Sequence, residues 1–134
     1  MPADPRELVG RWSLARRVAD RLAGQQGTMT GELIVSAEGA GLRWAERGTL
    51  SWAGALLPAT RTYLLRPGAD GWEVTFGDGR PFHPWRPGEL VTHPCRADVY
   101  TGLITVDRDR VGTLWEVRGP AKHQRLVTRF RRAG

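Results

Sequence analysis

The chain has one cysteine and no long apolar run. One cysteine cannot form an internal disulfide, which is typical of a reducing compartment. No segment approaches the roughly 20 consecutive apolar residues that a membrane helix needs. The N-terminal stretch MPADPRELVG lacks the apolar core of a signal peptide. We therefore expect a cytoplasmic protein without membrane spans.

The chain also lacks the motifs of the common nucleotide-binding and hydrolytic folds. It has no glycine-rich phosphate loop, no nucleophile elbow and no dinucleotide fingerprint. Internal repeats and low-complexity tracts are absent too, so the 134 residues are expected to form one domain, 1–134. Both a monomer and a homodimer are compatible with these features.

Basic residues outnumber acidic ones by 20 to 14, for a net charge of +6. Such an excess can indicate nucleic-acid binding. Here the basic residues, all but one of them arginine, are spread along the chain, and only residues 129–132 form a dense cluster. The distribution argues against nucleic acid as the partner.

Turn signals rich in glycine, proline and aspartate recur about every ten residues and predict an all-β fold. Short segments rich in β-branched and aromatic residues lie between them. The expected strands lie near residues 10–20, 28–36, 41–50, 59–66, 72–76, 89–93, 98–106, 111–118 and 123–132. Helix formers also occur before residue 20, but Gly10 favours a short helical turn over 4–9 followed by a strand.

Several of these segments alternate with a period of two, which is typical of a sheet with one buried and one exposed face. In 123–132, for example, Leu126, Thr128 and Phe130 oppose Arg125, Val127, Arg129 and Arg131. The pattern predicts a single antiparallel barrel of about eight to ten strands.

Two segments near the chain ends resemble those of the calycin barrels, which include lipocalins and intracellular lipid-binding proteins. LVGRWSL holds a Gly-x-Trp at Gly10 and Trp12, and VTRFRR lies near the end of the last strand. The resemblance implies that Trp12 closes the floor of the barrel and that Arg129 stacks on its ring. A cation above an indole face gains a favourable electrostatic contact.

Over its whole length the sequence is similar to a bacterial family known only as a domain of unknown function, DUF6314. The similarity is carried by LVGRWSL, GDGRPFH, THPCRADVYTG and WEVRGPAKHQRLVTRFRR. It implies a calycin-like fold and no particular chemistry.

THPCRADVYTG concentrates reactive side chains in one expected strand region. His93 and Cys95 share a side, as do Asp98 and Tyr100, because alternate strand residues point the same way. His and Cys are zinc ligands, but Pro94 and the distance in sequence to other ligands argue for no metal and for Cys95 as a core filler. Asp98 and Tyr100 are either a turn cap and a buried hydroxyl, or catalytic partners of His93.

GDGRPFH predicts a tight hairpin at Asp78-Gly79, after which Phe82 and His83 rim a pocket. His83 is a candidate ligand contact, general base or haem ligand. RGPAKHQ predicts a turn, and its Lys122 is either an anion anchor, an amine nucleophile or a solvated side chain.

The first expected strand places a cation inside the barrel. If Trp12 points inward, Leu14 and Arg16 do so as well, and a buried arginine needs a carboxylate or an anionic ligand. Glu46 shares a face with Trp44 and is the candidate partner. Paired, Arg16 and Glu46 form a structural ion pair; separated, they form a polar pocket.

These observations predict that the protein binds a small, largely apolar molecule, with a carboxylate or other anionic group, inside the barrel and without a cofactor. The expected ligand-binding residues are Arg16, Trp44, Glu46, His83, His93, Tyr100, Trp115 and Phe130. The alternative is a cofactor-independent isomerase, cyclase or hydrolase. Its candidate catalytic residues are His93, Tyr100, Asp98 and His83. Haem binding through His83 or His93 is a further alternative.

Overall fold

The computed structural model describes residues 4–133 and contains one antiparallel sheet of ten strands. The strands are β1 (Gly10–Asp20), β2 (Gln25–Glu38), β3 (Gly41–Trp52), β4 (Ala55–Gly68), β5 (Gly71–Phe76), β6 (Pro81–Pro84), β7 (Leu90–Cys95), β8 (Asp98–Asp107), β9 (Arg110–Gly119) and β10 (Lys122–Arg132). They confirm the prediction of an eight-to-ten-stranded barrel.

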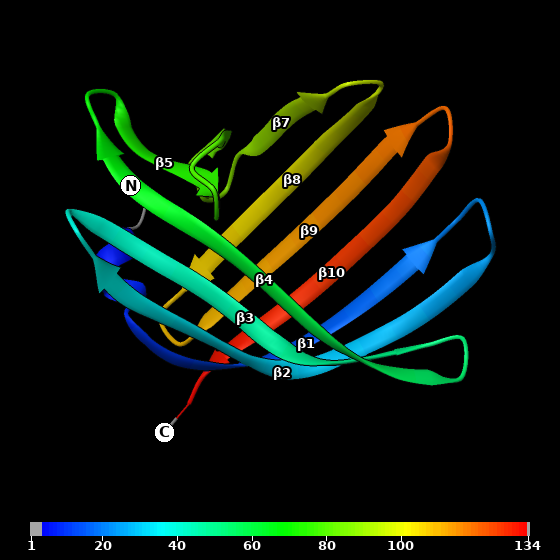
Figure 1. The fold of residues 1–134 in the computed structure, drawn as a ribbon. Coiled ribbons are helices and arrows are strands. Elements are labelled where there is room, and N and C mark those ends of the chain that lie inside the picture. The colour runs from blue at the N-terminus through cyan, green and yellow to red at the C-terminus, as the bar shows by residue number, and fades with distance from the viewer. Residues whose placement is uncertain (1–3, 134) are drawn as a thin grey trace.

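The strands lie in the order β6-β5-β4-β3-β2-β1-β10-β9-β8-β7, so the first and last long strands pair with each other. The sheet curls until β4 crosses in front of β9 and β10 (Figure 1). Four hairpin turns, β1–β2, β3–β4, β7–β8 and β9–β10, gather at one end, which we call the mouth (Figure 1). The opposite end is the floor.

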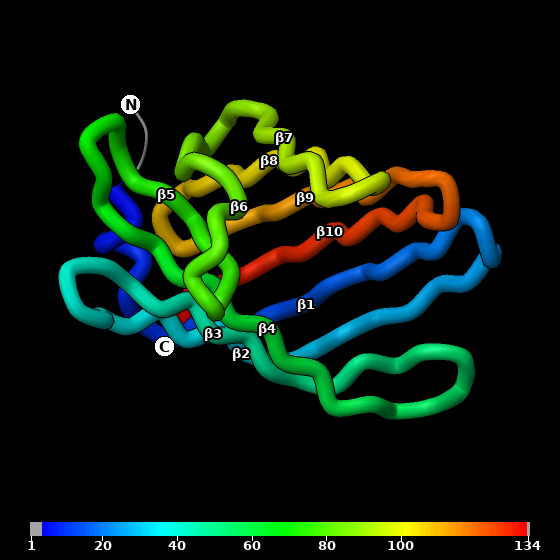
Figure 2. Tube along the Cα trace, turned by 45° about the horizontal axis from the view of Figure 1, so that its top comes forward, coloured from blue at the N-terminus to red at the C-terminus, as the bar shows by residue number. Residues whose placement is uncertain are grey.

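The connection from β6 to β7 brings the two edges of the sheet together. The Trp85 amide donates to the Trp72 carbonyl in β5, at 2.9 Å, and the Gly88 amide donates to the Ile104 carbonyl in β8, at 2.8 Å. The segment that carries β6 therefore bridges β5 and β8 and nearly closes the barrel, as Figure 2 shows. The sequence pattern predicted nine strands without β6 and placed Phe82 and His83 at a pocket rim.

A short 3-10 helix, η1 (Pro5–Leu8), covers the floor. Its N-cap is Asp4, whose side chain accepts from the Arg6 amide at 2.9 Å. No helix within residues 4–133 is long and apolar enough to cross a membrane. The expected helical turn followed by a strand is confirmed.

Trp12 is fully buried at the floor, and its indole N–H donates to the Leu8 carbonyl at 2.9 Å. The guanidinium above its ring belongs to Arg132, at 4.3 Å from the ring centroid, and not to Arg129. Arg129 is exposed, because strand alternation directs it outward when Thr128 and Phe130 point inward. The expectation for Arg129 was therefore wrong by strand parity.

Arg132 also joins the floor segments to one another. Its guanidinium donates to the Glu7 carbonyl at 2.8 Å, to the Val9 carbonyl at 3.2 Å and to the Asp109 carboxylate at 3.2 Å. Gly10 has a φ of 139°, and a Cβ there would lie 3.2 Å from Arg132 Nη1. Glycine at position 10 thus suits both the positive φ angle and the close approach of the Arg132 guanidinium.

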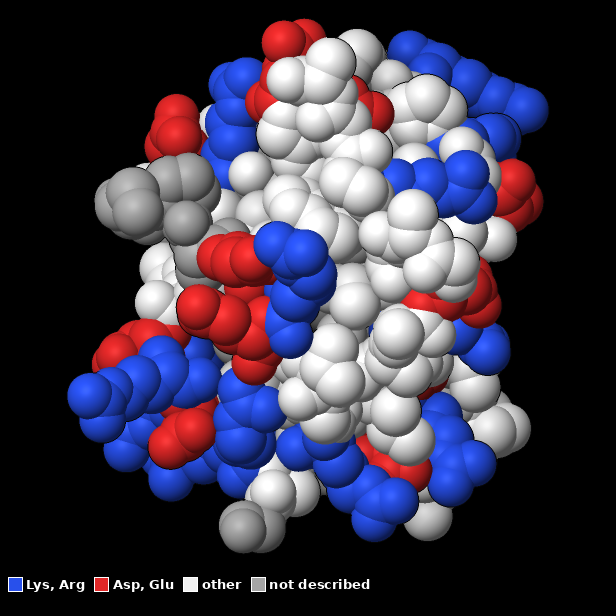
Figure 3. All heavy atoms as spheres, turned by 90° about the vertical axis from the view of Figure 1, so that its left-hand side faces the viewer, with Lys and Arg blue, Asp and Glu red and all other residues white. Residues whose placement is uncertain are grey.

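Charges on the floor end are mixed in sign. In Figure 3, which faces this end of the barrel, acidic side chains lie among the basic ones. Among the ion pairs on the molecular surface are Arg6–Asp4 at 2.8 Å and Arg132–Asp109 at 3.2 Å. The basic residues in this view do not form an unbroken surface of the kind that binds phosphate backbones.

Replacing Arg132 with Ala should lower the free energy of unfolding by about 2 kcal/mol, because a cation–π contact and charge-assisted hydrogen bonds are lost. Arg129→Ala is the matched control on the exposed side of the same strand, and it should change the free energy by less than about 0.5 kcal/mol. Urea denaturation of both variants measures this. Equal losses in the two variants would contradict the assignment of Arg132 to the floor.

Candidate functional site

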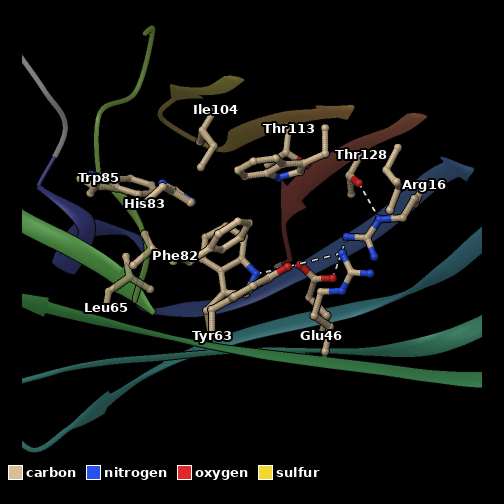
Figure 4. A pocket seen from close by; sticks show the side chains of 15 residues that line it. Arg16, Glu46, Tyr63, Leu65, Phe82, His83, Trp85, Ile104, Thr113 and Thr128 are labelled. Carbon is tan, nitrogen blue, oxygen red and sulfur yellow. Dashed lines mark hydrogen bonds and ion pairs between the residues drawn. The ribbon is translucent and has the colours of Figure 1, made fainter. Parts of the chain in front are cut away.

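The inner face of the barrel surrounds a cavity of about 40 Å³, which we call the inner cavity. Five of the expected ligand-binding residues line it: Arg16, Trp44, Glu46, His83 and Trp115. They come from β1, β3, β6 and β9, and Figure 4 shows how their side chains converge with those of the neighbouring strands. Their role toward a ligand stays a prediction.

Arg16 and Glu46 form an ion pair in the wall of this cavity. Arg16 Nη2 lies 2.6 Å from Glu46 Oε1, and both side chains are at least nine-tenths buried. Arg16 Nε donates to Thr128 Oγ1 at 2.7 Å, and the Trp44 indole N–H donates to Glu46 Oε2 at 2.8 Å (Figure 4). Of the two readings of this pair, the structure shows the ion pair, with hydrogen bonds satisfying both charges.

A second arginine, Arg61, lies beside this network. Its Nη1 lies 3.4 Å from the Tyr63 hydroxyl, and the two residues are two apart on β4. Arg61 is exposed as a whole residue, although its side chain lines the inner cavity. Partial burial opposes its charge, but Tyr63 and Glu46 outweigh that effect and raise the pKa of Arg61. Burial raises the pKa of the Tyr63 hydroxyl.

Phe82 is buried in the barrel interior and lines the inner cavity. Its ring stacks on Phe76 at 4.5 Å and on Trp115 at 4.9 Å between centroids, and it also stacks on Tyr63 at 5.6 Å. Its residue is 6% exposed. The expected pocket rim is therefore a plug: β6 directs Phe82 into the barrel rather than around its opening.

His83 follows Phe82 and lines the same cavity (Figure 4). Its Nδ1 lies 2.7 Å from the Pro84 carbonyl, which can only accept, so Nδ1 carries the proton. Burial, and the nearby His93, lower the pKa of His83 although the Pro84 carbonyl favours the charged form. The imidazole is neutral near pH 7, with Nε2 as an acceptor.

The other expected site residues lie outside the inner cavity. His93 and Tyr100 pair across β7 and β8, with ring centroids 6.1 Å apart, behind the ring of Phe82. Phe130 is buried against Trp44 at 5.3 Å, nearer the floor. These three were expected to contact a ligand, and Phe82 or the floor packing separates them from the cavity instead.

Asp98 does not join His93 and Tyr100 in a catalytic cluster. Its carboxylate lies 3.6 Å from Lys122 Nζ and packs against Gly119, where a Cβ would collide with Asp98 Oδ1. The sole lysine is therefore a half-exposed ion-pair partner. Pro94 fits within β7 because β7 is an edge strand, and Cys95 is only partly buried there.

Metal ligands do not gather anywhere in residues 4–133: no three of the His, Cys, Asp and Glu side chains lie close enough to hold an ion. Of the two histidines named as haem ligands, His83 lines the inner cavity of about 40 Å³ and His93 does not, and haem binding stays a prediction.

A larger space lies between the inner cavity and the mouth. This outer chamber, of about 270 Å³, is lined by inward-facing residues near the β1–β2, β3–β4 and β9–β10 turns. Its apolar wall includes Met29, Leu50, Trp52 and Leu126. Arg16, Arg61 and Leu126 line both spaces, so they form the boundary between them.

Several residues that line the inner cavity were not predicted to lie in the barrel interior, chiefly Arg61, Tyr63, Leu65, Phe82 and Trp85. The first three alternate along the expected strand 59–66, so strand periodicity alone would have placed them on one face. Phe82 and Trp85 carried no such signal. Phe82 belongs to a four-residue strand with a register shift against β5, where alternation is not informative, and Trp85 follows the end of that strand.

The ten-stranded, nearly closed antiparallel barrel with a polar network in its interior is a calycin-like barrel. The chain belongs to the family of unknown function DUF6314, whose family model matches residues 8–132. The sequence has no significant match among the curated proteins.

The fold is similar to the solved structure of the S-type phycobiliprotein lyase CPES from Guillardia theta. The TM-score is 0.70, with 96% of this chain and 90% of that chain covered, at 11% sequence identity. At that identity the likeness concerns the fold.

His83 should make the protein less stable in mild acid. Its lowered pKa means that, as pH falls below the unfolded value of about 6.5, the unfolded chain takes up a proton that the folded chain resists. Wild type should therefore lose up to about 1.4 kcal/mol per pH unit relative to His83→Gln as the pH falls below about 6.5. Urea denaturation across this range measures the difference.

His123→Gln, in a partly exposed histidine on β10, is the control and should keep the wild-type dependence. If His83→Gln and wild type lose stability in parallel, His83 does not titrate differently in the folded chain.

Proposed function

We propose that the protein binds a small, largely apolar molecule in the barrel interior, with entry from the mouth. The observation that carries the proposal is the outer chamber of about 270 Å³, which leads from the mouth to a buried, hydrogen-bonded polar network. Ligand sites commonly combine apolar walls with a few convergent polar groups. The similar fold of a phycobiliprotein lyase also supports a function for the interior of this barrel.

Phe82 limits how far such a ligand reaches. The outer chamber has room for a two- or three-ring molecule, but the inner cavity of about 40 Å³ does not. The space below the Arg16–Glu46 pair is filled by the Phe82 ring, which β6 supplies from the edge of the sheet. A ligand that reaches the His83 side of the barrel must displace this ring.

The uncharged fluorophore N-phenylnaphthylamine tests the proposal. It should bind the wild type saturably, with energy transfer from the tryptophans near both spaces, Trp44, Trp52 and Trp115. Phe82→Leu enlarges the inner cavity and should raise affinity about four- to fifteenfold, since one or two additional buried methylene equivalents contribute that much. Fluorescence titration measures both values.

Phe130→Leu is the matched control, because Phe130 is as buried as Phe82 but lies away from both spaces. It should lower stability and leave the affinity unchanged. Absence of saturable binding by the wild type would contradict the proposed function. Equal affinities in all three proteins would show that the probe does not reach the Phe82 side.

A further inference from the structure

We propose that Arg61, assisted by the Tyr63 hydroxyl, binds the anionic group of the ligand, and that the ligand is an apolar monocarboxylate or a similarly compact monoanion. The inference rests on the proposed function and assigns the polar end of the ligand to one place, the boundary between the inner cavity and the outer chamber.

Arg61 lies where a ligand that enters from the mouth would bring its polar group. Its side chain lines both spaces, and Tyr63, two residues further along β4 and so on the same face of the strand, lines the inner cavity. A ligand that enters at the mouth meets apolar side chains first, among them Leu50 and Trp52. Its leading polar group then arrives at the guanidinium.

Each guanidinium nitrogen of the other interior arginine already has a partner. The three nitrogens of Arg16 contact Thr128 Oγ1, Met29 Sδ and Glu46 Oε1, at 2.7, 3.7 and 2.6 Å. The second carboxylate oxygen of Glu46 accepts from the Trp44 indole at 2.8 Å. Arg16 was expected to meet the anionic group of a ligand, but this network leaves it little capacity to do so.

Arg61, by contrast, forms no ion pair within residues 4–133, and its hydrogen bond to Tyr63 is long, at 3.4 Å. The charged groups around the inner cavity are Arg16, Glu46 and Arg61, with a neutral His83. Two cations face one carboxylate, so one positive charge is unbalanced. A cation partly removed from water is stabilised by an anionic partner.

The acidic residue of the outer chamber does not supply that partner. Asp20 lies at the end of β1, and its Oδ1 accepts from the amides of Leu22 and Ala23, both at 3.1 Å. Its carboxylate thus holds the β1–β2 turn at the mouth. Within residues 4–133 it forms no ion pair with Arg61, so the Arg61 guanidinium has no carboxylate in contact with it.

The chemistry at this place selects a carboxylate on an apolar body. A guanidinium presents parallel N–H donors that match the two oxygens of a carboxylate, and the Tyr63 hydroxyl can donate to the same group. A monoanion balances the single excess charge, whereas a dianion leaves a charge uncompensated among apolar walls. The remaining contacts, with Met29, Leu50 and Leu126, suit hydrocarbon or aromatic rings.

A pair of probes with one aromatic skeleton tests the inference. Anilinonaphthalene sulfonate carries a compact monoanion, and N-phenylnaphthylamine is the same skeleton without it. Arg61→Gln should weaken sulfonate binding about ten- to one-hundredfold, the usual value of a charge-assisted hydrogen bond, and leave binding of the uncharged probe within about twofold. Decanoate and decanol, as competitors against the uncharged probe, repeat the comparison with a carboxylate.

Arg43→Gln is the matched control: it removes one positive charge from an exposed position on the outer face of β3. It should change the affinities for the charged and the uncharged probe by the same factor. Arg61→Lys keeps the charge but loses the paired donors, and it should fall between wild type and Arg61→Gln. Circular dichroism establishes that each variant keeps its strands.

The outcomes separate the two proposals. If the wild type binds the uncharged probe and Arg61→Gln weakens both probes equally, or neither, the anion anchor is overturned and the proposed function stands. If the wild type binds neither probe, the proposed function fails together with the anchor. Should Arg61→Gln lose its fold, the comparison of Arg61→Lys with Arg43→Gln decides between these outcomes.

Discussion

The interior of this barrel depends on the buried ion pair between Arg16 and Glu46. The pair joins β1 to β3 and, through Thr128, to β10, so three strands share one set of charged hydrogen bonds. Two charges away from water are costly unless each is compensated, and removal of one partner of such a pair typically costs about 3–5 kcal/mol. The pair therefore constrains which side chains can occupy the middle of the barrel. It also divides the interior into a floor side and a mouth side.

On the floor side, packing leaves little empty volume. Trp12, Leu33 and Phe130 are almost completely buried, and Arg132 covers the Trp12 ring from the direction of η1. The plug formed by Phe82 fills the space above them from the edge of the sheet. A ten-stranded barrel is wide enough for a ligand, so its small inner cavity follows from β6 folding inward rather than from the size of the barrel. On the mouth side, no comparable plug fills the outer chamber within the described residues 4–133.

Function in calycin-like barrels lies in the side chains that line them, since one fold hosts many activities. At 11% identity, the likeness to the phycobiliprotein lyase concerns the fold, so any inference about a ligand must come from the residues of this chain. Those residues combine a neutral buried histidine, a closed Arg16–Glu46 network and one unbalanced arginine. The proposal of an apolar monoanion follows from that balance of charge together with the apolar wall of the outer chamber.

Strand alternation in the sequence by itself predicted the barrel and the shared inner faces that carry Trp44, Glu46 and Trp115. The burial of Trp12 was implied by the resemblance to calycin barrels, and the inward direction of Arg16 followed from Trp12 by alternation. The same alternation in 123–132, with Thr128 and Phe130 inward, would have excluded Arg129, which was expected at the floor; Arg132 has the matching parity. Only the tertiary structure decided that Phe82 fills the interior and that His93 and Tyr100 lie behind it. These positions depend on how the two sheet edges meet, through Trp85 to β5 and Gly88 to β8, and contacts between residues distant in sequence leave no periodic signal in the chain.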